Sequence, residues 1–262
     1  MGDQAAGSST SEVITLRKLK ASDVWRAFQL GYRDFRLYPA YGLFFGGIYG
    51  LGGLFIVYGL LLLHMPWLII PVAIGFPLIG PFVAVGLYEI SRRHEMGEEI
   101  SWRAVLAQVF RQRERQLSWM AFVVLFIFWI WIYQVRLLMV LFLGSHIPAS
   151  LAGFLALVIG APQGMAFLAV GTLVGGVIAG LLFSVTVLAM PLLLDRDMDF
   201  ITAMMTSLRF VAENKLPAFI FGATIALAAI LAMLPAFLGL FLALPVMGHA
   251  TWHLYRQAVQ QG

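Results

Sequence analysis

The chain carries no charged side chain between Arg36 and Glu89, a gap of 52 residues. A helix that crosses about 30 Å of hydrocarbon needs about 20 apolar residues, so this gap has room for two crossings. A second uncharged stretch of 40 residues separates Lys215 from Arg256, and the block between residues 116 and 194 carries a single charge. This spacing predicts an all-α fold, a polytopic transmembrane helical bundle.

Composition supports the same fold class. Charged residues make up 11% of the chain, against about 25% in soluble domains. Hydrophobic residues make up 61%, and the mean hydropathy is +0.90. A soluble fold of this length could not hide so much apolar surface. The absence of cysteine excludes disulfides, thiolate metal sites and cysteine nucleophiles. The basic residues lie beside apolar stretches, which is typical of anionic membrane faces rather than of nucleic-acid binding.

The charge gaps predict six spans arranged as three hairpins, with turns at His64-Met65-Pro66 and at Pro235. The expected spans are residues 40–63, 67–88, 117–143, 165–194, 216–234 and 236–255. The apolar run at 150–160 is too short to cross. On this interpretation, residues 1–20 form a flexible cytoplasmic N-terminus, 21–256 a single transmembrane domain, and 257–262 a cytoplasmic tail.

The basic residues predict the orientation of these spans. Sixteen of the 17 lysines and arginines fall before the first span, in the second and fourth loops, or at the C-terminus, and the other loops carry none. Cytoplasmic loops attract lysine and arginine, so we expect both termini in the cytoplasm. A seventh span at 150–160 would place the basic residues of 196–215 outside.

A segment of similar design precedes each hairpin, at residues 23–38, 101–115 and 199–214. Each segment has apolar residues at helical spacing and basic or polar residues on another face, which is typical of helices that lie in the membrane interface. The segments align without gaps, so that Ala27 meets Ala104 and Ala203. This alignment predicts three parallel repeats. Candidates for lipid or partner contact are Trp25, Arg26, Arg33, Arg36, Trp102, Arg136 and Arg209.

His249 and His253 stand four residues apart, so their side chains share a helix face. Two imidazoles at this spacing are weak candidates for a metal or haem site. The neighbouring Trp252, Tyr255 and Arg256 favour a plain interfacial role instead, and a metal normally needs three or four ligands. We therefore predict no cofactor and no metal.

Arg136 lies within the third expected span. Its long side chain can snorkel to the headgroups or contact a substrate or partner.

Glycines recur every fourth residue on two of the expected spans. They are Gly42, Gly46 and Gly50 on the first, and Gly171 with Gly175 and Gly176 with Gly180 on the fourth. Small residues at this spacing let helix backbones approach closely. We expect them to serve packing inside the chain, with a homo-oligomer or a partner's helix as the alternative.

Catalytic patterns are missing from the sequence. No Ser-His-Asp arrangement, zinc-protease motif or phosphate loop is present. No carboxylate falls within the expected spans except Glu89 at an edge, whereas ion-coupled transporters usually carry them there. The sequence therefore predicts a protein that is not an enzyme.

The segment Ala-Ser-Asp-x-Trp-x-Ala-Phe-x-x-Gly-x-Arg-Asp at 21–34, the glycine-rich hairpin and Gly-Leu-Tyr-Glu-Ile-Ser-Arg-Arg at 86–93 resemble an uncharacterised bacterial family of predicted integral membrane proteins, a domain of unknown function. Some of its members carry the label cytochrome c oxidase subunit I. The resemblance implies residence in the inner membrane. A catalytic oxidase subunit needs several histidines deep in the membrane, and this chain has five in all, so an accessory role fits better.

Three functions remain open at this point. The first is a non-catalytic inner-membrane protein that binds partner proteins or lipids, accessory to a respiratory or envelope complex. The second is a passive or lipid-related transporter, and the third a haem or metal-binding membrane protein. The expected partners are the lipid bilayer and other membrane proteins or a second copy of the chain, and no nucleic acid.

Overall fold

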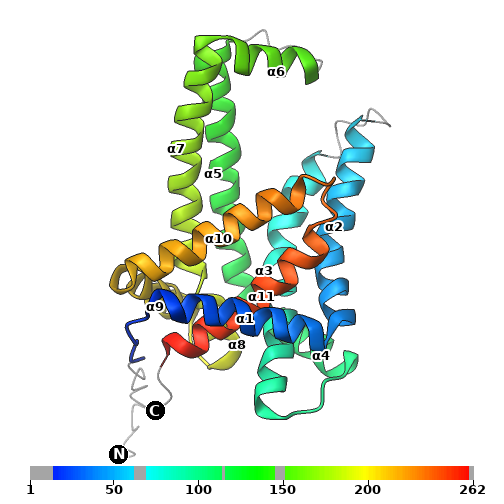
Figure 1. The fold of residues 1–262 in the computed structure, drawn as a ribbon, viewed down its shortest axis with the longest axis vertical. Coiled ribbons are helices and arrows are strands. Elements are labelled where there is room, and N and C mark those ends of the chain that lie inside the picture. Colours follow the sequence, from blue (N-terminus) through cyan, green and yellow to red (C-terminus); the bar gives the residue numbers. More distant parts are fainter. Residues whose placement is uncertain (1–13, 62–68, 114–115, 145–150, 260–262) are drawn as a thin grey trace, which may run out of the picture.

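The computed structural model describes residues 14–61, 69–113, 116–144 and 151–259, and this part of the chain is almost entirely helical (Figure 1). The long helices are α2 (Pro39–Leu61), α3 (Ile69–Met96), α5 (Leu117–Leu143), α7 (Pro162–Thr186), α10 (Lys215–Met233) and α11 (Leu240–Ala258). The shorter ones are α1 (Ala21–Leu37), α4 (Trp102–Arg113), α6 (Leu151–Gly160), α8 (Ala189–Asp195) and α9 (Phe200–Glu213). The all-α class predicted from the charge gaps is confirmed.

Three helices in the described residues are long and apolar enough to cross a membrane. They are Leu117–Leu143 with 27 residues, Pro162–Asp195 with 34 residues (α7 continued by α8), and Lys215–Met233 with 19 residues. These helices support a membrane protein with several apolar helices, whereas the six crossings stay a prediction. The expected turn at residues 64–66 lies outside the described residues.

The order of the elements follows the predicted repeat in part. Each of α1, α4 and α9 precedes two long helices that contact each other, with α6 and α8 added in the second group. The turn expected at Pro235 joins α10 to α11, and there Ala236 and Phe237 adopt positive φ angles of 48° and 66°. Gly239 closes this turn, because a Cβ on it would lie 2.6 Å from the backbone of Ala232.

Helices α5 and α7 rise together from the rest of the molecule, and α6 lies across their far end (Figure 1). The core lies instead where α1, α8, α9, the end of α3 and the second half of α11 meet. Its largest fully buried side chains include Trp252, Tyr255, Phe210, Phe221 and Leu188. The described residues are therefore packed most densely at the end of the molecule where the charged residues gather.

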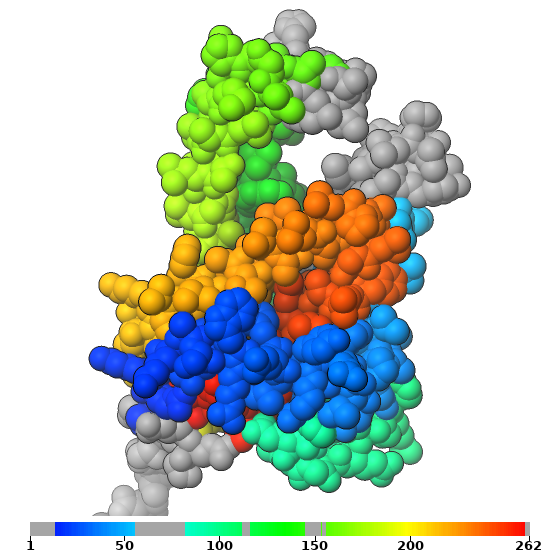
Figure 2. Space-filling model, viewed as in Figure 1, coloured from blue at the N-terminus to red at the C-terminus, as the bar shows by residue number. Residues whose placement is uncertain are grey.

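Helix α1 lies across one face of the molecule (Figure 2) and packs along α11. Its first turn is capped by Asp23, whose carboxylate accepts a hydrogen bond of 2.8 Å from the backbone N–H of Lys20. Small residues on the inner face of α1 let its backbone approach that of α11. A Cβ on Gly31 would lie 2.6 Å from the backbone nitrogen of Ala250 and 2.6 Å from the carbonyl oxygen of Val246. This close approach brings the next inward residue, Asp34, against α11.

Candidate functional site

Four polar side chains meet at the junction of α1, α3 and α11. Asp34, Ser91 and His249 have no exposed surface, and His253 is 6% exposed. We call these four residues the aspartate–histidine cluster. Asp34 continues the inner face of α1, Ser91 lies near the end of α3, and the two histidines are one turn apart on α11. Helical spacing on three separate elements therefore assembles the cluster.

The carboxylate of Asp34 is the centre of the cluster. Its Oδ2 atom lies 2.6 Å from Nε2 of His253 and accepts a hydrogen bond of 2.8 Å from the Ser91 hydroxyl. Nδ1 of His249 lies 2.8 Å from the same hydroxyl oxygen. A serine has one proton to donate. Because Ser91 donates it to Asp34, His249 must donate from Nδ1 to Ser91. Nε2 of His249 then has no hydrogen-bond partner in the described structure.

These contacts set the charge of Asp34. Burial by itself raises the pKa of this carboxyl, but the hydrogen bond and the charge of His253, with the hydrogen bond from Ser91, outweigh it and lower the pKa to about 2. The hydrogen-bond partners of Asp34 stabilise its ionised form in a site without water access. The cluster therefore joins α1 to α3 and α11 through a buried carboxylate and its hydrogen-bond partners.

The arrangement does not fit nucleophilic catalysis. In a catalytic triad one imidazole contacts both the hydroxyl and the carboxylate. Here Ser91 donates directly to Asp34, and the histidine beside the hydroxyl is not the one beside the carboxylate. Among the described residues, no group of three or more histidines and carboxylates is arranged to hold a metal ion. The geometry suits a structural role, in which the cluster holds α1, α3 and α11 together. We call this role the lock.

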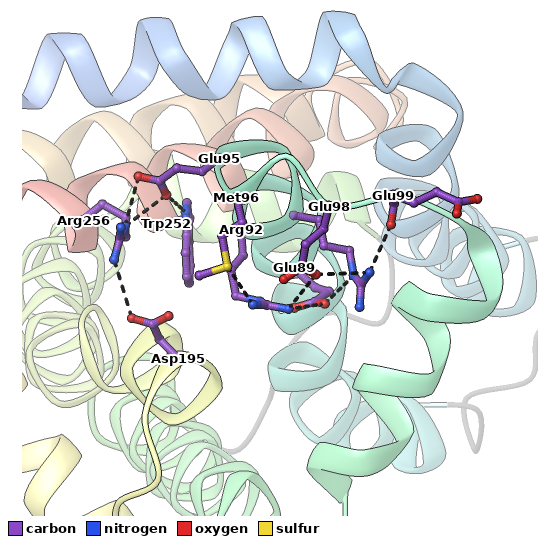
Figure 3. A network of polar contacts seen from close by, with 10 residues as sticks. Glu89, Arg92, Glu95, Met96, Glu98, Glu99, Asp195, Trp252 and Arg256 are labelled. Atoms are coloured by element: carbon purple, nitrogen blue, oxygen red, sulfur yellow. Dashed lines mark hydrogen bonds and ion pairs between the residues drawn. The ribbon is translucent and has the colours of Figure 1, made fainter.

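Further ion pairs and hydrogen bonds lie at the ends of α3 and α11 (Figure 3). Glu89 is fully buried and pairs with Arg92 at 2.7 Å and with Arg93 at 2.6 Å. Farther along, Glu95 accepts hydrogen bonds of 3.1 Å from the indole of Trp252 and 3.0 Å from Arg256.

The same network reaches α8. Arg256 lies 3.7 Å from Asp195, whose carboxylate accepts a hydrogen bond of 2.5 Å from the Tyr255 hydroxyl. Three helices far apart in sequence are thus joined by charge at one end of the molecule.

The contact candidates on α1 lie on its outer face. Trp25 is 54% exposed, Arg26 is exposed, and the guanidinium of Arg36 lies 6.0 Å from the ring centre of the exposed Tyr32. Arg33 differs from them, because its guanidinium bonds to the buried Asp34 at 3.2 Å. Only part of the predicted basic face of α1 therefore remains available to lipid or to a partner.

The remaining candidates are scattered over other helices. Trp102 stacks on Tyr41, with ring centres 4.1 Å apart. Arg209 pairs with Glu213 at 3.7 Å and donates to the carbonyl of Ile14. Arg136 is exposed on α5. The structure does not bring these residues together with the outer face of α1.

The structure places His249 and His253 in the protein interior rather than on its surface. Both rings lie inside the packed junction with Asp34 and Ser91, away from the surface. Sequence reasoning missed Asp34 because it falls between Arg33 and Arg36 in a segment whose charges indicated a solvated face. The available signal was Gly31, one turn before Asp34, which marks the closely packed side of the helix.

The two glycine-rich helices use their small residues differently. On α2, the space beside Gly42 is filled by Phe35 of α1 and by Pro245 of α11. The space beside Gly46 is also filled by Pro245, and the space beside Gly50 by Phe241 of α11. On α7, Gly171 and Gly175 face Leu138 and Trp131 of α5. A Cβ on Gly176 or Gly180 would meet no atom within 4 Å. One face of α7 is therefore packed and the other is open.

Comparison with known proteins gives one match. Residues 69–195, from the start of α3 to the end of α8, match the family model described as "Predicted integral membrane protein (DUF2189)". No match was found among curated proteins or among solved structures. The matched range contains Ser91 and the ion-pairing end of α3, whereas Asp34 and both histidines lie outside it.

Proposed function

We propose that this chain, an integral membrane protein whose residues 69–195 match a predicted membrane family, is a non-catalytic inner-membrane protein that binds anionic lipid through the outer face of α1. The observation that carries the proposal is the division of α1 into two faces. Val24, Ala27, Gly31 and Asp34 are buried against the bundle, while Trp25 and Tyr32 remain 54% and 50% exposed beside arginines. Exposed aromatic and basic residues side by side are typical of a helix in the membrane interface.

Electrostatics gives this face its preference for anionic lipid. Each basic residue near an anionic leaflet contributes about 1 kcal/mol to its attraction. Arg26 and Arg36 can contribute in this way, while Arg33 is held by Asp34. A partner protein of a respiratory or envelope complex is the competing occupant of the face. The transporter alternative gains no specific support from the described residues. The haem alternative gains none either, because both histidine rings already bond to Ser91 and Asp34.

Replacing Arg26 and Arg36 together by glutamine is expected to lower the apparent affinity for anionic lipid roughly thirtyfold, because about 2 kcal/mol of attraction is lost. The measurement is the thermal midpoint of the detergent-purified protein, titrated with phosphatidylglycerol or with phosphatidylcholine. Lys18→Gln removes an exposed charge that lies before α1 and should change the response little. An unchanged response of the double variant to phosphatidylglycerol would show that these arginines face a protein partner instead.

The orientation of the chain is part of the same proposal. Reporter fusions at residues 1 and 262 should both report a cytoplasmic location, and a fusion near Ala152 a periplasmic one. The reason is that 16 of 17 basic residues lie in the segments assigned to one side. A periplasmic C-terminus would require an odd number of crossings and would rule out the six-span arrangement.

A further inference from the structure

An unfilled groove lies between two of the helices that can cross a membrane. It has a volume of about 540 Å³ and runs between α7 and α10, with α9 at one end. Small residues line both sides, Gly176, Ala179 and Gly180 from α7 and Ala218, Gly222, Ala223 and Ala226 from α10. In Figure 1, α10 runs obliquely across the lower end of α7. We call this the α7–α10 groove.

The groove is open because its glycines have no neighbours to fill them. Nothing lies within 4 Å of a Cβ built on Gly176 or Gly180, and a Cβ on Gly222 would touch only Phe183, at 3.4 Å. The matching glycines on the other side of α7 are covered by α5. Close packing is the normal state of a protein interior, so this face lacks an occupant that the rest of α7 has.

A positive charge stands at one end of the groove. Lys215 is exposed, lines the groove and is the first residue of α10. The one acidic side chain close to Lys215 in sequence, Glu213, pairs with Arg209. The groove is therefore apolar along its length and cationic at its end.

We propose that the α7–α10 groove binds an anionic phospholipid, with an acyl chain between the two helices and the phosphate beside Lys215. The lipid-binding role of the previous section is the basis for this proposal, which adds a second and tighter site. The apolar lining of the groove matches an acyl chain, and the cation at its end matches a phosphate. A helix from a second copy is the competing occupant.

Two variants test the two halves of this site by native mass spectrometry of the whole chain released from detergent. The wild-type chain should retain one phosphatidylglycerol and lose it less readily than phosphatidylcholine. Gly180→Leu places a side chain in the open groove without a clash, and by displacing about two methylenes it should lower retention roughly tenfold. Lys215→Gln should weaken the preference for phosphatidylglycerol roughly fivefold and leave phosphatidylcholine unaffected.

The matched controls are Gly160→Leu and Lys18→Gln. Gly160 has nothing within 4 Å of its Cβ position and lies on α6, outside the groove. Circular dichroism and gel filtration should show that Gly180→Leu and Lys215→Gln keep the wild-type fold. Equal lipid retention by folded Gly180→Leu and wild type would overturn the proposal, and so would a wild-type dimer that Gly180→Leu dissociates. These outcomes do not depend on Arg26 and Arg36, so each lipid site can fail without the other.

Discussion

Replacing Asp34 by asparagine is expected to lower the free energy of unfolding by about 1–3 kcal/mol, the usual cost of disturbing the hydrogen bonds of a buried polar group. Asparagine keeps the size of the side chain but removes the charge opposite His253, 2.6 Å away. The Ser91 hydroxyl and the His253 ring then lose their ionised partner, and the polar attachment of α1 to α11 is weakened. Thermal or denaturant unfolding of the detergent-purified protein measures the loss. Limited proteolysis should at the same time cut the variant first within α1.

The matched control for Asp34→Asn is Glu99→Gln, which removes an exposed carboxylate. It should change stability by less than about 0.5 kcal/mol, as surface substitutions usually do. A stable Asp34→Asn variant with wild-type protease resistance would contradict the role of the cluster as a lock.

Lowering the pH should remove part of the same stability, because it protonates Asp34. The pKa of Asp34 is about 2 in the folded chain against an ordinary value of 3.8, and a pKa lowered by folding contributes stability above the ordinary value. That contribution, about 2 kcal/mol, should be full above pH 4 and disappear as the pH falls toward 2. The difference in the free energy of unfolding between wild type and Asp34→Asn should become smaller over the same pH range. If this difference became smaller between pH 7 and 5 instead, the stability of the cluster would depend on a histidine rather than on Asp34.

Gly31→Leu is expected to cost about 3 kcal/mol, at the upper end for overpacked sites. The obstacle is backbone: the nitrogen of Ala250 and the carbonyl oxygen of Val246 both lie 2.6 Å from the added Cβ. Backbone atoms cannot turn aside as the end of a side chain can, so α1 must move away from α11. Asp34, one turn later, would move with it. Unfolding measurements in detergent report the cost.

Gly160→Leu is the control for this substitution as well. Leucine is the better helix former by roughly 0.8 kcal/mol, and the open surroundings of Gly160 allow that gain to be measured separately. If Gly31→Leu proved as stable as wild type, the close contact of α1 with α11 would be wrong.

Charge spacing predicted the long helices well because lipid and protein interiors both exclude charge. The expected span 117–143 coincides with α5, and the spans at 165–194 and 216–234 fall within Pro162–Asp195 and within two residues of Lys215–Met233. The predicted interfacial segments at 23–38, 101–115 and 199–214 likewise correspond to α1, α4 and α9.

The candidate site could not be predicted in the same way. Its partners are far apart in the chain: Ser91 lies 57 positions after Asp34, and His253 lies 219 positions after it. Periodicity reports which residues share a face, but it does not report which face meets another helix. Asp34 and Arg36 are both charged residues of α1, and only the packing of Gly31 against α11 makes one of them buried.

The separation of Asp34 from His253 also has a consequence in time. A ribosome adds about 5–20 residues per second, so the 219 positions between them take roughly 10 to 45 s to synthesise. During that interval α1 exists without the helix that receives it, and its carboxylate must remain in water. Helix α1 can therefore dock onto α11 only after this delay, and it stays exposed to proteases until α11 has been made.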